Sequence, residues 1–240
     1  MLTRLEVRSL RAGYGKVEII HNIDLIVGDG EIVSIIGPNG SGKSTLLKSI
    51  VGLARVFGGS IRLDGLELVG RDTEDIAMAG IAFTPQVDNV FTNLNADENL
   101  ELGGYKITDK NILKNRMREM YEIFHEIEPI RRMKAGLMSG GERQMLAVAR
   151  AMMVGPKVLM LDEPTANLSP KTVASLIKKI QDIRDSGVPV IIVEQNVKFA
   201  LDLADRICVL VSGYKTYEGS PSELMKLDLQ QVFLGLKAKN

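Results

Sequence analysis

The sequence predicts an α/β fold with a mainly parallel sheet, an antiparallel β patch near the N-terminus and an inserted helical subdomain. Continuous apolar runs rich in β-branched residues alternate with helical patterns, as in a parallel sheet covered by helices on both faces. The stretches "LEVRSL", "VEIIHNIDLIV" and "GSIRLDGLEL" alternate in polarity instead, as antiparallel strands do. Residues 87–153 contain no convincing strand. Together these three patterns predict the fold class.

The expected buried strands cover residues 31–37, 81–85, 157–164, 188–195 and 206–211. The expected helices cover residues 43–53, 142–153, 170–186 and 196–204. A further amphipathic helix of about four turns or more is predicted by apolar residues at spacings of four and three, namely Leu113, Met117, Met120, Phe124 and Ile127. The tail "DLQQVFLGLKAKN" predicts a short helix with a frayed end. We therefore expect a core formed by residues 1–86 and 156–240, with residues 87–155 as the helical subdomain.

The composition narrows the classes of function. Lys+Arg and Asp+Glu both number 30, so the net charge is zero and nucleic acid is a poor candidate partner. The single cysteine, Cys208, excludes an internal disulfide and stands in the apolar run "RICVLV", which indicates a core position. No apolar run approaches the length of a membrane span, and the N-terminus does not look like a signal peptide. We expect a cytosolic protein that acts at a membrane only through a partner.

A phosphate-binding motif follows the first expected buried strand. Residues 37–45, "GPNGSGKST", match G-x-x-x-x-G-K-[ST] and open a helix, as the motif requires. Its glycines let backbone N–H groups point at phosphate oxygens. Lys43 is expected to reach the β- and γ-phosphates of a nucleotide, and Ser44 to ligate Mg²⁺. The candidate nucleotide-binding residues of this P-loop are Gly37, Asn39, Gly40, Ser41, Gly42, Lys43, Ser44 and Thr45.

An acidic pair ends the expected strand "KVLMLDEP". Four apolar residues would bury this strand and place Asp162 at its carboxyl edge, where α/β sites lie. Asp162 is the candidate for the Mg²⁺ shell, and Glu163 is the candidate base for the attacking water. Taken alone, "DEP" fits an acidic turn before Pro164 better. Together with the P-loop it predicts a P-loop NTPase core.

A second anion-binding feature lies in "MSGGERQ", at residues 138–144. A helix that begins on Ser139, Gly140, Gly141 and Glu142 presents free N–H groups and the positive end of its dipole. A serine-capped helix start with a flexible hinge explains the same residues without a ligand.

With these motifs the chain resembles the ATP-binding subunits of ABC transporters over nearly all of its length. Their signature, usually LSGGQ, corresponds to residues 138–142. The resemblance implies that two ATPase subunits pack head to tail, so that the signature of one covers the γ-phosphate of ATP on the P-loop of the other. It also implies integral-membrane permease subunits as partners and a peripheral position on the cytoplasmic face of the cell membrane.

Other positions of the family can be compared one by one. The resemblance implies that Tyr14 stacks on adenine, and that Gln86 contacts Mg²⁺ or the lytic water and links the core to the helical insert. Ser169 stands where the family usually has aspartate. Gln195 stands where it usually has a histidine that contacts the γ-phosphate, and both histidines of the chain lie elsewhere. Gln195 is therefore expected to face the γ-phosphate across from Glu163.

The segment after Gln86, roughly residues 87–104, is expected to carry part of the docking surface for the permease. In resembling subunits the groove between the core and the helical insert receives a short helix of the permease. Val90, Phe91 and Leu94 are apolar residues in this otherwise polar stretch. Packing beneath the insert explains them nearly as well.

The subtype and the alternatives rest on local signals. "VEQN", "MSGGERQMLAVARAMM" and the C-terminal "FLGL" look like the LivF-type subunit of branched-chain amino acid importers, which implies a related, non-identical ATPase partner. A urea or amide importer and an exporter stay open. A soluble ABC-type ATPase acting on ribosomes or DNA fits less well, because the chain has one cassette, zero net charge and no basic insertion. A regulatory module without turnover would not need Glu163.

Overall fold

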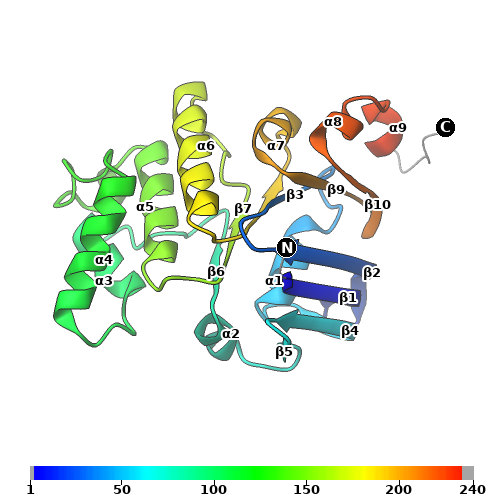
Figure 1. The fold of residues 1–240 in the computed structure, drawn as a ribbon, viewed down its shortest axis with the longest axis horizontal. Helices are drawn as coiled ribbons and strands as arrows, with labels where there is room; N and C mark the ends of the chain where they lie inside the picture. Colours follow the sequence, from blue (N-terminus) through cyan, green and yellow to red (C-terminus); the bar gives the residue numbers. More distant parts are fainter. Residues whose placement is uncertain (1–2, 234–240) are drawn as a thin grey trace.

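Two sheets organise the chain, and the computed structural model describes residues 3–233. The first sheet is antiparallel, with strand order β2-β1-β4-β5. Its strands are β1 (Thr3–Tyr14), β2 (Val17–Gly28), β4 (Arg55–Leu63) and β5 (Leu66–Glu67). This is the antiparallel patch that the alternating N-terminal stretches predict. Figure 1 shows it below and to the right of the larger sheet.

The second sheet has the order β10-β9-β3-β8-β7-β6 and is parallel except for β10. Its strands are β3 (Ile32–Ile36), β6 (Ile81–Thr84), β7 (Val158–Asp162), β8 (Val190–Glu194), β9 (Arg206–Val211) and β10 (Tyr214–Gly219). All five expected buried strands are present. The predicted strand 157–164 ends early at Asp162, because Glu163 adopts a φ of 48° and leaves the extended conformation.

Helices cover both faces of the second sheet. Alternate residues of each strand belong to different apolar clusters, as the period of two in a strand requires. Helix α1 (Lys43–Ile50) packs on one face, between the two sheets. The opposite face is covered by α5 (Gly140–Met152), α6 (Pro170–Asp185) and α7 (Val197–Leu203). Figure 1 shows these three helices on the far side of the sheet from the antiparallel strands.

The segment between β6 and β7 is helical, with α3 (Ala96–Gly103) and α4 (Lys110–Ile123) packed near α5 at one end of the molecule (Figure 1). The prediction that the amphipathic helix continues to Ile127 is wrong. Phe124 ends α4 with φ −105° and ψ 56°, outside the helical region. Phe124 and Ile127 are nevertheless fully buried, because the turn after α4 folds back onto the same core.

Two short helices do not follow from the apolar pattern, namely α2 (Thr73–Ala79) and α8 (Pro221–Leu224), whereas α9 (Leu229–Phe233) lies in the tail where a short helix is expected. Of the predicted tail helix, α9 is present, and residues 234–240 lie outside the described residues, as does most of "FLGL". Cys208 is a core residue, as predicted, and burial raises the pKa of its thiol to about 12. No helix within residues 3–233 is both long and apolar enough to cross a bilayer.

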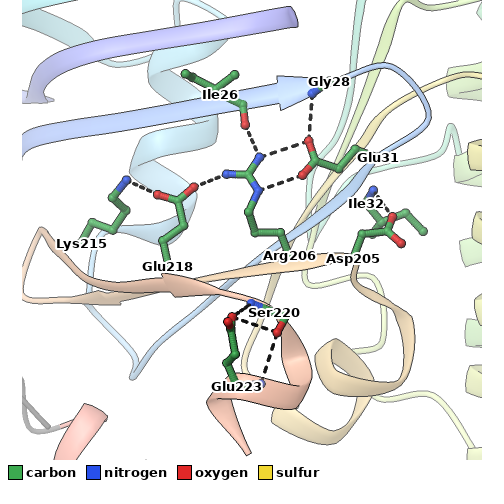
Figure 2. Close-up of polar contacts among 10 residues, drawn as sticks. All are labelled: Ile26, Gly28, Glu31, Ile32, Asp205, Arg206, Lys215, Glu218, Ser220 and Glu223. Atoms are coloured by element: carbon green, nitrogen blue, oxygen red, sulfur yellow. Dashed lines mark hydrogen bonds and ion pairs between the residues drawn. The ribbon is translucent and has the colours of Figure 1, made fainter. Parts of the chain in front are cut away.

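A charged network joins the two sheets at the edge where β2 ends and β3 begins (Figure 2). The Arg206 guanidinium donates to both oxygens of Glu31, at 2.8 and 3.1 Å, and also to the carbonyl of Ile26 and to Glu218. Glu218 in turn accepts from Lys215. These contacts connect β9 and β10 of the mainly parallel sheet to β2 of the antiparallel sheet. They lie at the amino end of β3, away from the P-loop.

Candidate nucleotide-binding and hydrolysis site

The P-loop connects β3 to α1, as its motif predicts. Gly40 and Gly42 have φ values of 76° and 98°, which a residue with a side chain rarely adopts. Gly42 is the N-cap of α1, and a Cβ there would lie 2.8 Å from Cδ1 of Ile20. The loop therefore needs glycine at these positions to bring its backbone to the start of the helix.

Lys43 lies inside the curve of this loop and is 5% exposed. Its Nζ donates to the carbonyl oxygens of Gly37 at 2.9 Å and Pro38 at 3.1 Å. Burial lowers the pKa of Lys43, and the negative charges of Glu163 and Asp162 oppose this. The ammonium is thus held at the loop by two carbonyls, and phosphate oxygens could replace them as acceptors.

Ser44 and Asp162 come together from α1 and β7. Ser44 Oγ donates to Asp162 Oδ1 at 2.9 Å. Burial raises the pKa of Asp162, the hydrogen bond from Ser44 lowers it in part, and the charge of Glu163 raises it further. A hydroxyl and one carboxylate are oxygen ligands of the kind that Mg²⁺ uses beside substrate phosphates. These two residues could hold the ion.

Glu163 is held by two glutamine amides. Gln86 Nε2 donates to Oε2 of Glu163 at 2.6 Å, and Gln195 Nε2 donates to Oε1 at 2.6 Å. The left-handed backbone of Glu163, with φ 48°, is unusual for a residue with a side chain and costs about 1–3 kcal/mol. The structure therefore brings Gln86, Glu163 and Gln195 together, and it fixes both oxygens of the carboxylate.

Glu194 is a further buried carboxylate at this site, and sequence reasoning missed it. It is 2% exposed and accepts hydrogen bonds from Thr165, Gln195 and Asn196. Burial raises the pKa of Glu194, and these hydrogen bonds lower it in part. The signal in the sequence was a charged residue at the end of the otherwise apolar run "VIIVE".

The signature residues form the N-terminus of α5. Ser139 is its N-cap and accepts from Glu142 N at 3.3 Å, while the Glu142 carboxylate accepts from Ser139 N at 2.7 Å. This capping box is the structural explanation that the sequence left open. A Cβ on Gly141 would lie 2.6 Å from Cγ2 of Thr172 on α6. Because α5 and α1 cover opposite faces of the sheet, the signature residues pack against α6 and not against the P-loop.

The remaining candidates lie at the end of β1, in the P-loop and at the start of α6. Tyr14 ends β1 at the turn into β2, and the residue is 41% exposed. Asn39 is exposed at the tip of the P-loop, whereas Ser41 and Thr45 are buried. Ser41 Oγ has no hydrogen-bond partner within residues 3–233. Ser169, at the position of the usual aspartate, caps α6 by accepting from Thr172 N at 3.3 Å.

Comparison with known proteins identifies the family. A family model described as ABC transporter matches residues 20–166, more than half of the chain. The chain belongs to the ABC transporter family. The match includes the P-loop, Gln86, the signature and Glu163, whereas Tyr14 and Gln195 lie outside it.

Named relatives within the ABC transporter family cover most of the chain. A probable branched-chain amino acid transport ATP-binding protein, LivF, of Archaeoglobus fulgidus is 43% identical over 92% of this chain and 94% of its own length. The high-affinity branched-chain amino acid transport ATP-binding protein BraG of Pseudomonas aeruginosa is 44% identical over 83% of this chain and 85% of its own. The dimeric ATP-binding cassette MJ0796, solved with ADP and Pi, superposes with a TM-score of 0.81 at 27% identity, covering 90% of this chain and 98% of that one.

Proposed function

We propose that this ABC transporter family chain is the ATP-hydrolysing subunit of a membrane importer for branched-chain amino acids. The main support for hydrolysis is that Gln86 and Gln195 both donate hydrogen bonds to the Glu163 carboxylate. Such contacts orient the carboxylate, and a general base must be oriented towards the water it activates. The likeness to LivF and BraG supports branched-chain amino acids as the solute. A urea or amide importer and an exporter are the alternatives.

Each residue of the site has a proposed role in hydrolysis. The P-loop N–H groups and Lys43 bind the phosphates of ATP, and Tyr14 stacks on the adenine. Ser44 and Asp162, joined at 2.9 Å, would hold Mg²⁺ together with Gln86. When bound, the ion neutralises charge on the β- and γ-phosphates.

Glu163 accepts the proton of the attacking water, and its two amide partners set the direction of its oxygens. Gln195 faces the γ-phosphate and can donate a hydrogen bond to it, but it cannot carry a proton as histidine can. The site on this P-loop therefore turns over more slowly than one with histidine in that position.

The signature completes a site on a second subunit. Ser139 and Gly140 are exposed at the start of α5, which presents free N–H groups to solvent. They are far from the P-loop of their own chain, across the sheet. We therefore assign residues 139–142 to the γ-phosphate of ATP bound by a homologous, non-identical ATPase partner.

A groove beside the helical segment fits the permease contact. It has a volume of about 500 Å³ and lies between α2, β6 and the ends of α3 and α5. Apolar side chains at its lining are exposed, among them Met78 at 60%, Leu102 at 44% and Tyr105 at 61%. We propose that residues 87–155 form a subdomain that docks the permease here, on the cytoplasmic face of the membrane.

Reconstitution tests this assignment. The chain, its ATPase partner and the permease subunits from neighbouring genes are placed in proteoliposomes with a binding protein loaded with leucine, urea or a short amide. We expect ATP-dependent leucine uptake, and no uptake when Glu163→Gln is present in both ATPase subunits at the equivalent position. Uptake of urea or an amide alone would replace the proposed solute, and ATP-driven efflux would replace the direction.

A further inference from the structure

Glu194 lies beneath the site, at the end of the strand between the P-loop strand and the acidic strand. In the parallel register Glu194 is opposite Ile36 of β3, and its neighbour Val193 is opposite Asp162 of β7. The residue is buried, with 2% of its surface exposed. It therefore lies at the carboxyl edge where both neighbouring strands release their functional segments.

The Glu194 carboxylate joins two of these segments. Oε1 accepts from the N–H of Thr165 at 3.0 Å and from its hydroxyl at 2.7 Å. Oε2 accepts from the N–H of Gln195 at 3.1 Å and from that of Asn196 at 3.3 Å. One oxygen thus accepts hydrogen bonds from the segment that follows Glu163, and the other accepts hydrogen bonds from the segment that contains Gln195. A buried carboxylate needs such donors in place of water.

The same two segments meet again above Glu194. Gln195 Nε2 donates to Glu163 Oε1 at 2.6 Å, and Glu163 N donates to the Val193 carbonyl at 2.9 Å. Glu163, Thr165, Glu194 and Gln195 therefore form a closed ring of covalent and hydrogen bonds. The ring contains the left-handed turn at Glu163, a conformation that persists only where its surroundings fix it.

We propose that Glu194 is a positioning residue for ATP hydrolysis, which links the segment after Glu163 to the Gln195 turn and so sets the direction of the Glu163 carboxylate. This rests on the proposed function, in which Glu163 takes the proton from water. The hydrogen bonds of Lys43 Nζ go to the P-loop carbonyls and not to Glu194. Loss of Glu194 should therefore slow hydrolysis without weakening nucleotide binding.

Glu194→Gln tests the inference, because it keeps the size of the side chain and turns one acceptor oxygen into a donor. In the assembled transporter we expect kcat to fall by about three- to tenfold, the order expected for one lost hydrogen bond, because Gln86 and Gln195 can still contact the Glu163 carboxylate. The Kd of this chain for mant-ATP should change by less than about twofold, since the P-loop contacts remain. Unchanged kcat would overturn the role of Glu194.

Thr165→Val removes one donor to the same carboxylate and serves if Glu194→Gln does not fold. We expect a smaller loss of kcat, again with unchanged Kd. The double variant should lose less than the product of the two single losses, because both changes act on one contact. Full multiplicative losses, or a Thr165→Val variant with wild-type kcat, would contradict the link.

Glu31→Gln is the matched control. Glu31 is also a buried carboxylate, 8% exposed, but it lies in the Arg206 network at the other end of the sheet (Figure 2). The Glu31→Gln variant should have a lower melting temperature than the wild type and an unchanged kcat. If Glu194→Gln behaves like this control, Glu194 is only structural. If the wild type hydrolyses ATP and Glu163→Gln does not, the proposed function stands whatever Glu194→Gln does; a wild type without hydrolysis would reject both.

Discussion

Gln195 donates its side-chain amide to Oε1 of Glu163 across 2.6 Å. The side-chain amide of Gln86 donates to the second oxygen of the same carboxylate. Gln195 thus contacts the candidate base directly. The two amides together fix both oxygens of the Glu163 carboxylate.

We predict that Gln195→Ala lowers kcat by less than about tenfold, because one hydrogen bond is lost and Gln86 still holds Glu163. Gln86→Ala removes the hydrogen bond to the other oxygen and should cost at least as much, because Gln86 is also assigned to Mg²⁺. The double variant should lose more than either, because Glu163 is then free to rotate. The measurement is steady-state ATPase of the assembled complex with the changes in this subunit only. A loss of roughly 100-fold or more for Gln195→Ala alone would make it a full catalytic residue.

Lys43→Ala should remove most of the nucleotide affinity of this chain. The ammonium makes charge-assisted hydrogen bonds to phosphate, which are stronger than neutral ones. Titration with mant-ATP measures the Kd. Lys114→Ala, at an exposed position on α4, is the control and should bind like the wild type. Equal affinities for both variants would remove Lys43 from the site.

Ser139→Ala should impair hydrolysis at the partner's P-loop and spare nucleotide binding at this chain's own. It removes the N-cap of α5, which costs about 1 kcal/mol, and loosens the N–H groups assigned to the partner's γ-phosphate. Ser220→Ala is the matched control, since Ser220 and Glu223 form the same capping box on α8. Mixed complexes with one inactivated P-loop distinguish the two sites. Identical ATPase rates for the two serine variants would contradict the assignment of the signature.

Phe91→Asp should uncouple transport from ATP hydrolysis without unfolding the subunit. Phe91 is 48% exposed, and the centroid of its ring lies 4.6 Å from the guanidinium carbon of Arg150, which lines the proposed permease groove. Aspartate can pair with this arginine, so the fold should tolerate it. Val90, by contrast, is 8% exposed and packs in the core, as the packing alternative expects.

Solute uptake and ATPase rate are measured together for this variant. Met225→Asp, at an exposed apolar position after α8, is the control and should leave coupling intact. A lower melting temperature of Phe91→Asp with no separation of uptake from hydrolysis would favour packing over docking.

The contact of Glu218 with Arg206 and Lys215 predicts a pH-dependent stability. Burial by itself raises the pKa of Glu218, but the hydrogen bonds and charges of Lys215 and Arg206 bring it below the ordinary value of 4.5. Because the folded-state pKa is depressed, the stabilisation is present above the unfolded-state pKa and is lost as the pH falls through the folded value.

Glu218→Gln should therefore lower the free energy of unfolding by about 1–3 kcal/mol at pH 7, and the difference from wild type should shrink towards pH 3. Urea denaturation at several pH values measures it. Glu101→Gln, at an exposed position on α3, should stay within about 0.5 kcal/mol of wild type throughout. A difference that is constant with pH would exclude this ion pair as its source.

The sequence by itself determined the features that depend on neighbouring residues. The P-loop, the buried strands and the capped start of α5 each follow from glycine placement, apolar runs and a capping box within a few residues. These local preferences act whatever the rest of the chain does, so α1 begins at Lys43 as expected, and α5 begins at Gly140, within the signature motif and two residues before the expected helix 142–153.

Only the tertiary structure decided which side chains meet. Gln86 and Gln195 reach Glu163 from 77 and 32 residues away in the sequence, and Glu194 joins Thr165 across 29 residues. These contacts exist because the parallel register places the ends of β6, β7 and β8 side by side. The early end of α4 has the same origin, since burial of Phe124 and Ile127 in the shared core outweighs the helical pattern. Hydrogen bonds and burial between distant segments leave no periodic trace in the chain, and packing alone decides them.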